Sequence, residues 1–172
     1  LDELIAYANN ALPLINNVFA SYTVHGIRHS INVMEYMYEL IVDIDKLSEL
    51  EVALLIYSAL LHDIGMIANE DEIKKIKMDQ TILGERKYSK VLDKYGDETV
   101  ALQECIRPVH GKRAKDYIEG QMDEKFFLIP ESTSISFKSE LAKICMSHNE
   151  DFEWIKKNLR SDEKKGHFDL NA

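Results

Sequence analysis

The residues of this sequence best suited to chemistry are His62 and Asp63, which end a long apolar segment. Residues 50–63 read LEVALLIYSALLHD and carry one charge, Glu51, before Asp63. A buried carboxylate is costly unless a positive charge pairs with it, and no Lys or Arg lies within one helical turn of Asp63. A divalent cation is the natural compensating charge, and the His62 imidazole is a suitable ligand beside it. In the alternative interpretation, His62 caps the helix and Asp63 accepts backbone hydrogen bonds in a turn.

A second histidine, His29, is predicted to reach the same place from a neighbouring helix. The apolar pattern predicts a helix over about residues 25–43, in which His29, Val33, Tyr36 and Leu40 form a stripe at the edge of the apolar face. His29 should therefore point to the interior. Together with His62 and Asp63 it would give a mixed nitrogen and oxygen ligand set. Such ligands suit Mn, Fe, Ni or Zn, and Mg is also a candidate ion.

The remaining pattern is helical throughout. Residues 50–63 are apolar on all sides, as expected of a buried central helix, and Gly65 is predicted to cap its end. Residues 70–97 form a polar excursion with one or two short helices, and the next helical region is broken at Pro108. A later stripe of Phe137, Leu141, Ile144 and His148 turns His148 inward.

Composition agrees with one all-α domain over residues 1–172. The 172 residues are 45% hydrophobic and include only seven Gly and three Pro. The net charge of −9 argues against a nucleic-acid surface or an anionic membrane as partner. No apolar run is long enough to span a bilayer, and Cys105 and Cys145 are interpreted as free thiols, so we expect a cytoplasmic location. The chain starts at Leu1 and stops within an unfinished segment, which predicts a C-terminally incomplete fragment of a longer protein.

The strings HGIRHSINV and, further along, ALLHDIGM resemble the HD superfamily of metal-dependent phosphohydrolases. The resemblance is firm over residues 22–66 and looser through RPVHGKRAKDYI and ICMSHNED. It implies an all-α, HD-domain-like helical bundle in which His29 is the first family histidine and His62 and Asp63 are the pair. It also implies hydrolysis of a nucleotide or other phosphate ester by a water activated on one or two divalent metal ions, with Asp63 as a catalytic residue.

Further residues extend the expected site. Members of the superfamily with two metals use later histidines, so His110 and His148 are predicted metal ligands; each could instead be a satisfied, half-buried histidine. His25, Arg107 and Arg113 are predicted to bind substrate, and the alternative for the two arginines is a solvated helix face. We expect a phosphorylated small molecule, a nucleotide above all, as the partner, and either fused domains or a homo-oligomer.

The sequence also departs from the superfamily pattern. The last Asp ligand of the superfamily has no good match, because Asp151, Asp162 and Asp169 lie in a polar tail. The acidic pair that follows His-Asp in the guanosine tetraphosphate hydrolases and the GYP signature of the cyclic-dinucleotide branch are both missing. Two other functions therefore stay open at this stage: a non-catalytic nucleotide-sensing or regulatory module within a larger multidomain protein, and a helical interaction domain without metal.

Overall fold

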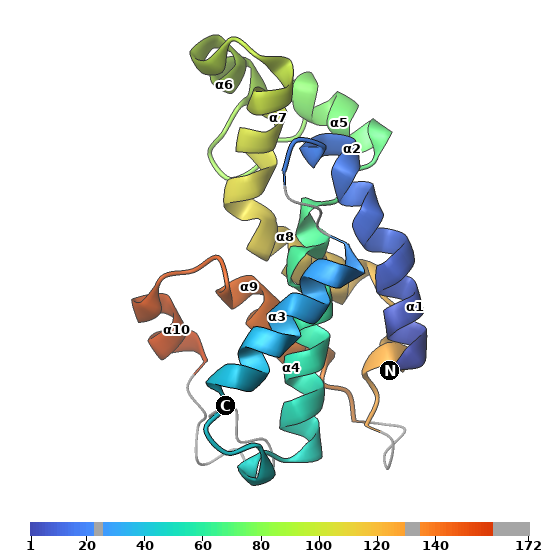
Figure 1. Cartoon of the computed structure of the whole chain (residues 1–172). Coiled ribbons are helices and arrows are strands. Elements are labelled where there is room, and N and C mark those ends of the chain that lie inside the picture. The colour runs from blue at the N-terminus through green and yellow to red at the C-terminus, as the bar shows by residue number, and fades with distance from the viewer. Residues whose placement is uncertain (23–25, 130–134, 160–172) are drawn as a thin grey trace.

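The computed structural model describes residues 1–22, 26–129 and 135–159, and these residues fold into helices without a β-strand (Figure 1). The predicted all-α fold is confirmed. The α-helices are α1 (Asp2–Ala11), α2 (Asn16–Phe19), α3 (Ile27–Leu40), α4 (Glu49–Leu61), α5 (Glu70–Lys77), α6 (Tyr88–Tyr95), α7 (Glu98–Ile106), α8 (His110–Gln121), α9 (Lys138–Ser147) and α10 (Phe152–Asn158). Short 3₁₀ turns connect several of them: η1 (Leu12–Ile15), η2 (Ile44–Lys46), η3 (His62–Met66), η4 (Arg107–Val109) and η5 (Glu124–Phe127).

Helix α4 is the central helix that the apolar pattern predicts. A capping box starts it: the Ser48 hydroxyl accepts the Glu51 amide at 3.2 Å, and the Glu51 carboxylate accepts the Ser48 amide at 2.6 Å. The helix then buries Leu54, Leu60 and Leu61 in the main core. The buried end of α4 therefore has a fixed position. The side chains of His62 and Asp63, which follow it directly, are held in place by that end.

The end of α4 differs from the prediction. The helix ends at Leu61 and tightens into η3, so Gly65 lies inside a 3₁₀ turn and does not cap the helix. Gly65 has no positive φ, whereas Gly84 and Gly96 do. Among the described residues no single helix has the length and apolar composition needed to cross a membrane. The segment α4–η3 and helix α5 meet both requirements only when they are counted together, across a bend of 50°.

The second half of the chain carries the later histidines to η3. The predicted break at Pro108 is confirmed: α7 stops at Ile106, η4 turns the chain, and α8 begins at His110. Proline has no amide hydrogen to continue the α-helical ladder, which explains the break. Helix α8 packs against both η3 and α9, so three segments far apart in sequence meet.

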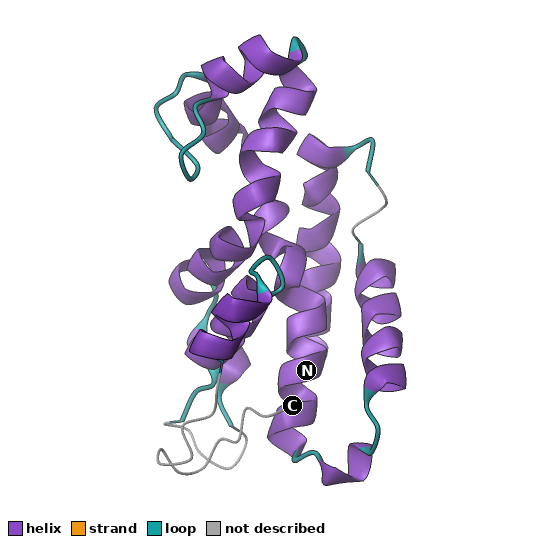
Figure 2. Cartoon of the chain, turned by 90° about the vertical axis from the view of Figure 1, so that its left-hand side faces the viewer, coloured by secondary structure: helices purple, strands orange, loops and turns teal. Residues whose placement is uncertain are grey.

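The remaining elements lie at the edges. Residues 70–97, the predicted polar excursion, contain α5 and α6, which lie at one end of the molecule in Figure 1. Helix α3 lies in front of α4 in Figure 1 and at the right-hand edge in Figure 2. Of its residues only Ser30 is buried. The prediction that its apolar stripe faces the interior holds at His29 but is wrong at Tyr36 and Leu40, which are exposed.

Candidate metal centre

Asp63 lies at the centre of four histidines, with one carboxylate oxygen directed to each pair. The residue is 7% exposed. Its Oδ2 lies 3.0 Å from Nε2 of His62 and 3.3 Å from Nε2 of His29. Its Oδ1 lies 3.6 Å from Nε2 of His110 and 3.9 Å from Nε2 of His148. The five predicted metal ligands therefore come together as two groups of three that share Asp63.

The helix ends place these side chains. His29 is in the first turn of α3, His110 begins α8, and His148 follows the last residue of α9. His62 and Asp63 open η3, where α4 runs out. Since backbone groups at helix ends are not all committed to the helical ladder, side chains there can converge on a common point without breaking a helix.

Three of the histidines have a fixed tautomer. The Nδ1 of His62 bonds the Ala59 carbonyl at 3.1 Å, and that of His110 bonds the Arg107 carbonyl at 2.5 Å. The Nδ1 of His148 bonds the Cys145 carbonyl in the same way. A carbonyl oxygen can only accept, so Nδ1 carries a hydrogen and Nε2 is the ring nitrogen that remains to bind a proton or a cation beside Asp63. This is the arrangement in which metal-ligating histidines are usually held.

The donor atoms of His29, His62 and Asp63 have the spacing expected of ligands to one divalent cation, whereas the separations among His110, His148 and Asp63 spread from 2.7 to 3.9 Å. The Nε2 atoms of His110 and His148 are 2.7 Å apart, and those of His29 and His62 are 3.4 Å apart. Two imidazole nitrogens that share one ion at about 2.1 Å are separated by about 3.0–3.4 Å at right-angled to tetrahedral geometry. In the His110–His148 pair, moreover, two lone pairs face each other, which is unfavourable without a cation or proton between them. The residues therefore fit a site for one or two ions.

The pKa values of His148 and His62 shift in opposite directions. Burial lowers the pKa of His148 to about 4, helped by the neighbouring His110 and His62, so this imidazole is neutral at pH 7, as a ligand must be. At His62 burial also lowers the pKa, but the hydrogen bond and charge of Asp63 outweigh it and the net shift is upward. A cation and a proton would therefore compete for Nε2 of His62.

Comparison with known families gives a match over most of the chain. The family model described as HD-CE matches residues 19–172, which is most of the chain and includes all five residues of the cluster. The chain belongs to the HD-CE family. No curated protein and no solved structure gives a significant match.

Two glycines of this HD-CE chain allow its helices to approach closely enough to form the cluster. A Cβ at Gly65 would lie 2.0 Å from the His110 carbonyl oxygen and 2.3 Å from the Ala114 amide nitrogen. A Cβ at Gly111 would lie 2.7 Å from the Met146 carbonyl oxygen. Neither position has room for any side chain, so η3, α8 and α9 meet backbone to backbone beside the ligands. Sequence reasoning missed this role because no local pattern distinguishes a glycine at a tertiary contact from one in a turn.

Arg113 holds the turn that carries Asp63. Its Nε donates to the Gly65 carbonyl and its Nη2 to the Ile67 carbonyl, both at 2.7 Å, while Nη1 pairs with Glu72 at 2.5 Å. These contacts connect α8, η3 and α5 through one guanidinium, which can make them together because its donors are fixed in one plane. Most of the hydrogen-bond donors of Arg113 already have partners within the protein. Its predicted role in substrate binding stays untested.

We expect Arg113→Lys to lower the free energy of unfolding by about 1–3 kcal/mol, because one ammonium cannot reach both carbonyls and Glu72 together. Urea denaturation followed by circular dichroism measures the change. Lys115→Met is the matched control: Lys115 forms an (i, i+4) pair with Glu119 on the same helix, and its loss should change stability by less than about 0.5 kcal/mol. Equal stability of Arg113→Lys and the parent chain would contradict this role.

The other predicted site residues lie in different surroundings. Arg107 is exposed on η4, where its Nη1 is 3.4 Å from the Tyr22 hydroxyl; its role in substrate binding stays a prediction. His25, Asp162 and Asp169 lie outside the described residues. Asp151 caps α10 by accepting the Trp154 amide and is not part of the cluster. Within the described ranges, no carboxylate besides Asp63 joins either metal-binding group.

Proposed function

We propose that this HD-CE chain is a metal-dependent phosphohydrolase that acts on a nucleotide or another phosphate ester. The observation that carries the proposal is the position of Asp63, whose two oxygens each face a different pair of histidines. A carboxylate shared in this way can hold two cations close together, which is the arrangement that stabilises both the attacking and the leaving oxygen of an in-line phosphoryl displacement.

Asp63 and three of the four histidines have a defined part in this chemistry. Bound divalent ions would supply a water of lowered pKa and a Lewis acid for a phosphoryl oxygen. Asp63 belongs to both ligand groups and so fixes the distance between them. The hydrogen bonds from Nδ1 of His62, His110 and His148 to backbone carbonyls keep the Nε2 atoms directed at Asp63. These groups are held before any ligand arrives, so little reorganisation is needed on binding.

The histidines of the cluster differ in how far they are exposed. The side chains of His62 and His110 are 17% and 13% exposed, whereas those of His29 and His148 are 34% and 29% exposed. Arg107 is three residues before His110 and exposed, so its guanidinium is available for a phosphate group. We infer that the phosphoryl group enters between His29 and His148, with Arg107 neutralising part of its charge.

We expect the purified chain with manganese to release phosphate from at least one of a panel of nucleotides, or to cleave a nitrophenyl phosphodiester. Chelation by EDTA should lower the rate about 100-fold or more, because the water then loses its activating cation, and added manganese should restore it. Phosphate and nitrophenolate assays measure both steps. A rate that EDTA leaves unchanged would contradict the proposal.

A non-catalytic nucleotide sensor is the second candidate. One observation favours it: each ligand group contains only three residues, and no further carboxylate joins them in the part of the chain that the structure describes. Calorimetric titration with the same nucleotides separates the two functions. Binding that needs metal but gives no product after long incubation supports the sensor; turnover supports the enzyme.

A further inference from the structure

The two ligand groups of the metal centre have different spacings. In the first group, which consists of His29, His62 and Asp63, the donor atoms are 3.0, 3.3 and 3.4 Å apart. All three separations lie within the range of about 3.0–3.4 Å that the ligands of one ion adopt. In the second group, which consists of Asp63, His110 and His148, the separations are 2.7, 3.6 and 3.9 Å. None of these lies within that range, so only the first group already has the spacing of an ion site.

The second group is held by helices in backbone contact. His110 begins α8 and His148 follows the last residue of α9. The two helices meet at Gly111, where a Cβ would lie 2.7 Å from the Met146 carbonyl oxygen. Each imidazole also donates from Nδ1 to a carbonyl three residues earlier. Bringing the three donors into range therefore means moving a packed helix or breaking one of these hydrogen bonds, and either change costs binding free energy.

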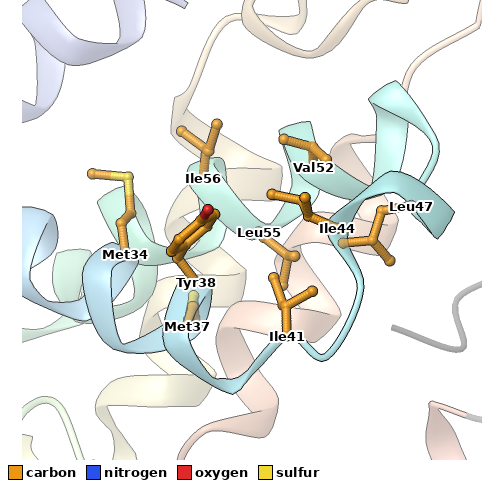
Figure 3. A pocket seen from close by; sticks show the side chains of 9 residues that line it. All are labelled: Met34, Met37, Tyr38, Ile41, Ile44, Leu47, Val52, Leu55 and Ile56. Carbon is orange, nitrogen blue, oxygen red and sulfur yellow. The ribbon is translucent and has the colours of Figure 1, made fainter.

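The first group can adjust at lower cost. His29 is carried by α3, of whose residues only Ser30 is buried. Further along, an open apolar groove of about 270 Å³ separates α3 from α4, and its walls include Met37 and Leu55 (Figure 3). A helix that lies over a groove has fewer close contacts to lose when it shifts by a fraction of an ångström. The side chain of His29 can therefore move toward an ion that the end of α4 holds.

We propose that the metal centre fills in sequence: the first group holds one divalent ion tightly, and the second group holds its ion only at higher metal concentration. The shared carboxylate increases the difference. Once the first group is filled, part of the negative charge of Asp63 is neutralised, and the two cations repel each other. We expect the two dissociation constants to differ by about tenfold or more.

Sequential filling gives the proposed phosphohydrolase a dependence on free metal, because clamping both oxygens of a phosphoryl displacement needs both ions. It rests on the metal centre of the proposed function but not on turnover. Two ions bound in sequence by a chain that hydrolyses no phosphate ester would refute the enzyme and leave sequential filling standing. Equal affinities in an active enzyme would refute sequential filling alone.

The test is isothermal titration calorimetry of the metal-free chain with manganese, followed by electron paramagnetic resonance of the same samples. We expect two binding steps, a tight one and a weak one. After one equivalent the spectrum should be that of isolated Mn²⁺, and in excess manganese it should broaden because neighbouring ions couple magnetically. Two steps of equal affinity, coupled pairs from the first addition, or a single ion that no excess of manganese joins would each overturn the proposal.

His29→Asn and His148→Asn assign the two steps to the two groups. They are a matched pair, because each removes the more exposed imidazole of its group, 34% and 29% exposed, by the same chemical change. His29→Asn should abolish the tight step and keep the weak one. His148→Asn should abolish the weak step and leave the tight dissociation constant within about twofold.

The control is Asp93→Asn, an exposed change on α6 that should alter neither step. Circular dichroism confirms that the variants fold, and the titration of the parent chain tests the two affinities without any variant. Loss of the tight step in His148→Asn, with the tight step kept in His29→Asn, would overturn the proposed order of filling.

Discussion

Asp63→Asn is expected to remove metal from both ligand groups at once and to lower any phosphohydrolase rate about 10³-fold or more. The reason is that one carboxylate supplies an oxygen to each pair of histidines, so no other single residue of the cluster belongs to both groups. An amide of the same shape keeps the packing but loses the negative charge that attracts the cations. Metal analysis of the purified variant by inductively coupled plasma mass spectrometry measures the loss.

Variants of single histidines are the sharpest control for this result. His62→Ala affects only the group with His29, and His110→Ala affects only the group with His148. Each should lower the metal content by no more than one ion, whereas Asp63→Asn should lower it to zero. Asp93→Asn, an exposed change on α6, should have no effect. Metal content in Asp63→Asn equal to that of either histidine variant would contradict a shared carboxylate.

The sequence made part of this centre predictable because the evidence is local. An Asp at the end of a segment with hardly any charge, without Lys or Arg nearby, favours a cation as its partner if that segment is buried. The spacing of apolar residues in α9 predicts which side of the helix His148 extends, although the residue is partly exposed, and the missing amide hydrogen of Pro108 predicts the break there. These predictions needed no knowledge of which helices pack together.

The rest could not be predicted because it depends on contacts between distant segments. That Asp63 divides its oxygens between two pairs depends on how η3 meets α8, and Arg113 finds its partners 41 to 48 residues away. The apolar pattern of α3 has the right period for a buried helix, yet Leu40 is 80% exposed. A pattern shows that one face of a helix is apolar but not what covers that face.

Gly65→Ala is expected to be more destabilising than the same change at the other glycines whose surroundings the structure describes, Gly84, Gly96, Gly111 and Gly120. The new Cβ would lie 2.0 Å from the carbonyl oxygen of His110 and 2.9 Å from the carbonyl carbon of Arg113, far inside van der Waals contact. Both neighbours are backbone atoms of α8, which cannot rotate away as a side chain could. The free energy of unfolding should fall by about 3–5 kcal/mol, as measured by urea denaturation.

Gly120→Ala provides the matched control, because it adds the same methyl group to α8 where nothing lies within 4 Å. There the loss of glycine's conformational freedom should stabilise the chain by up to about 1 kcal/mol. If Gly65→Ala still folds, α8 must move away from η3 and carry His110 with it. The metal group of His110 and His148 should then be lost, while the group of His29 and His62 is kept. Full metal content in a destabilised Gly65→Ala chain would mean that the close approach serves stability alone.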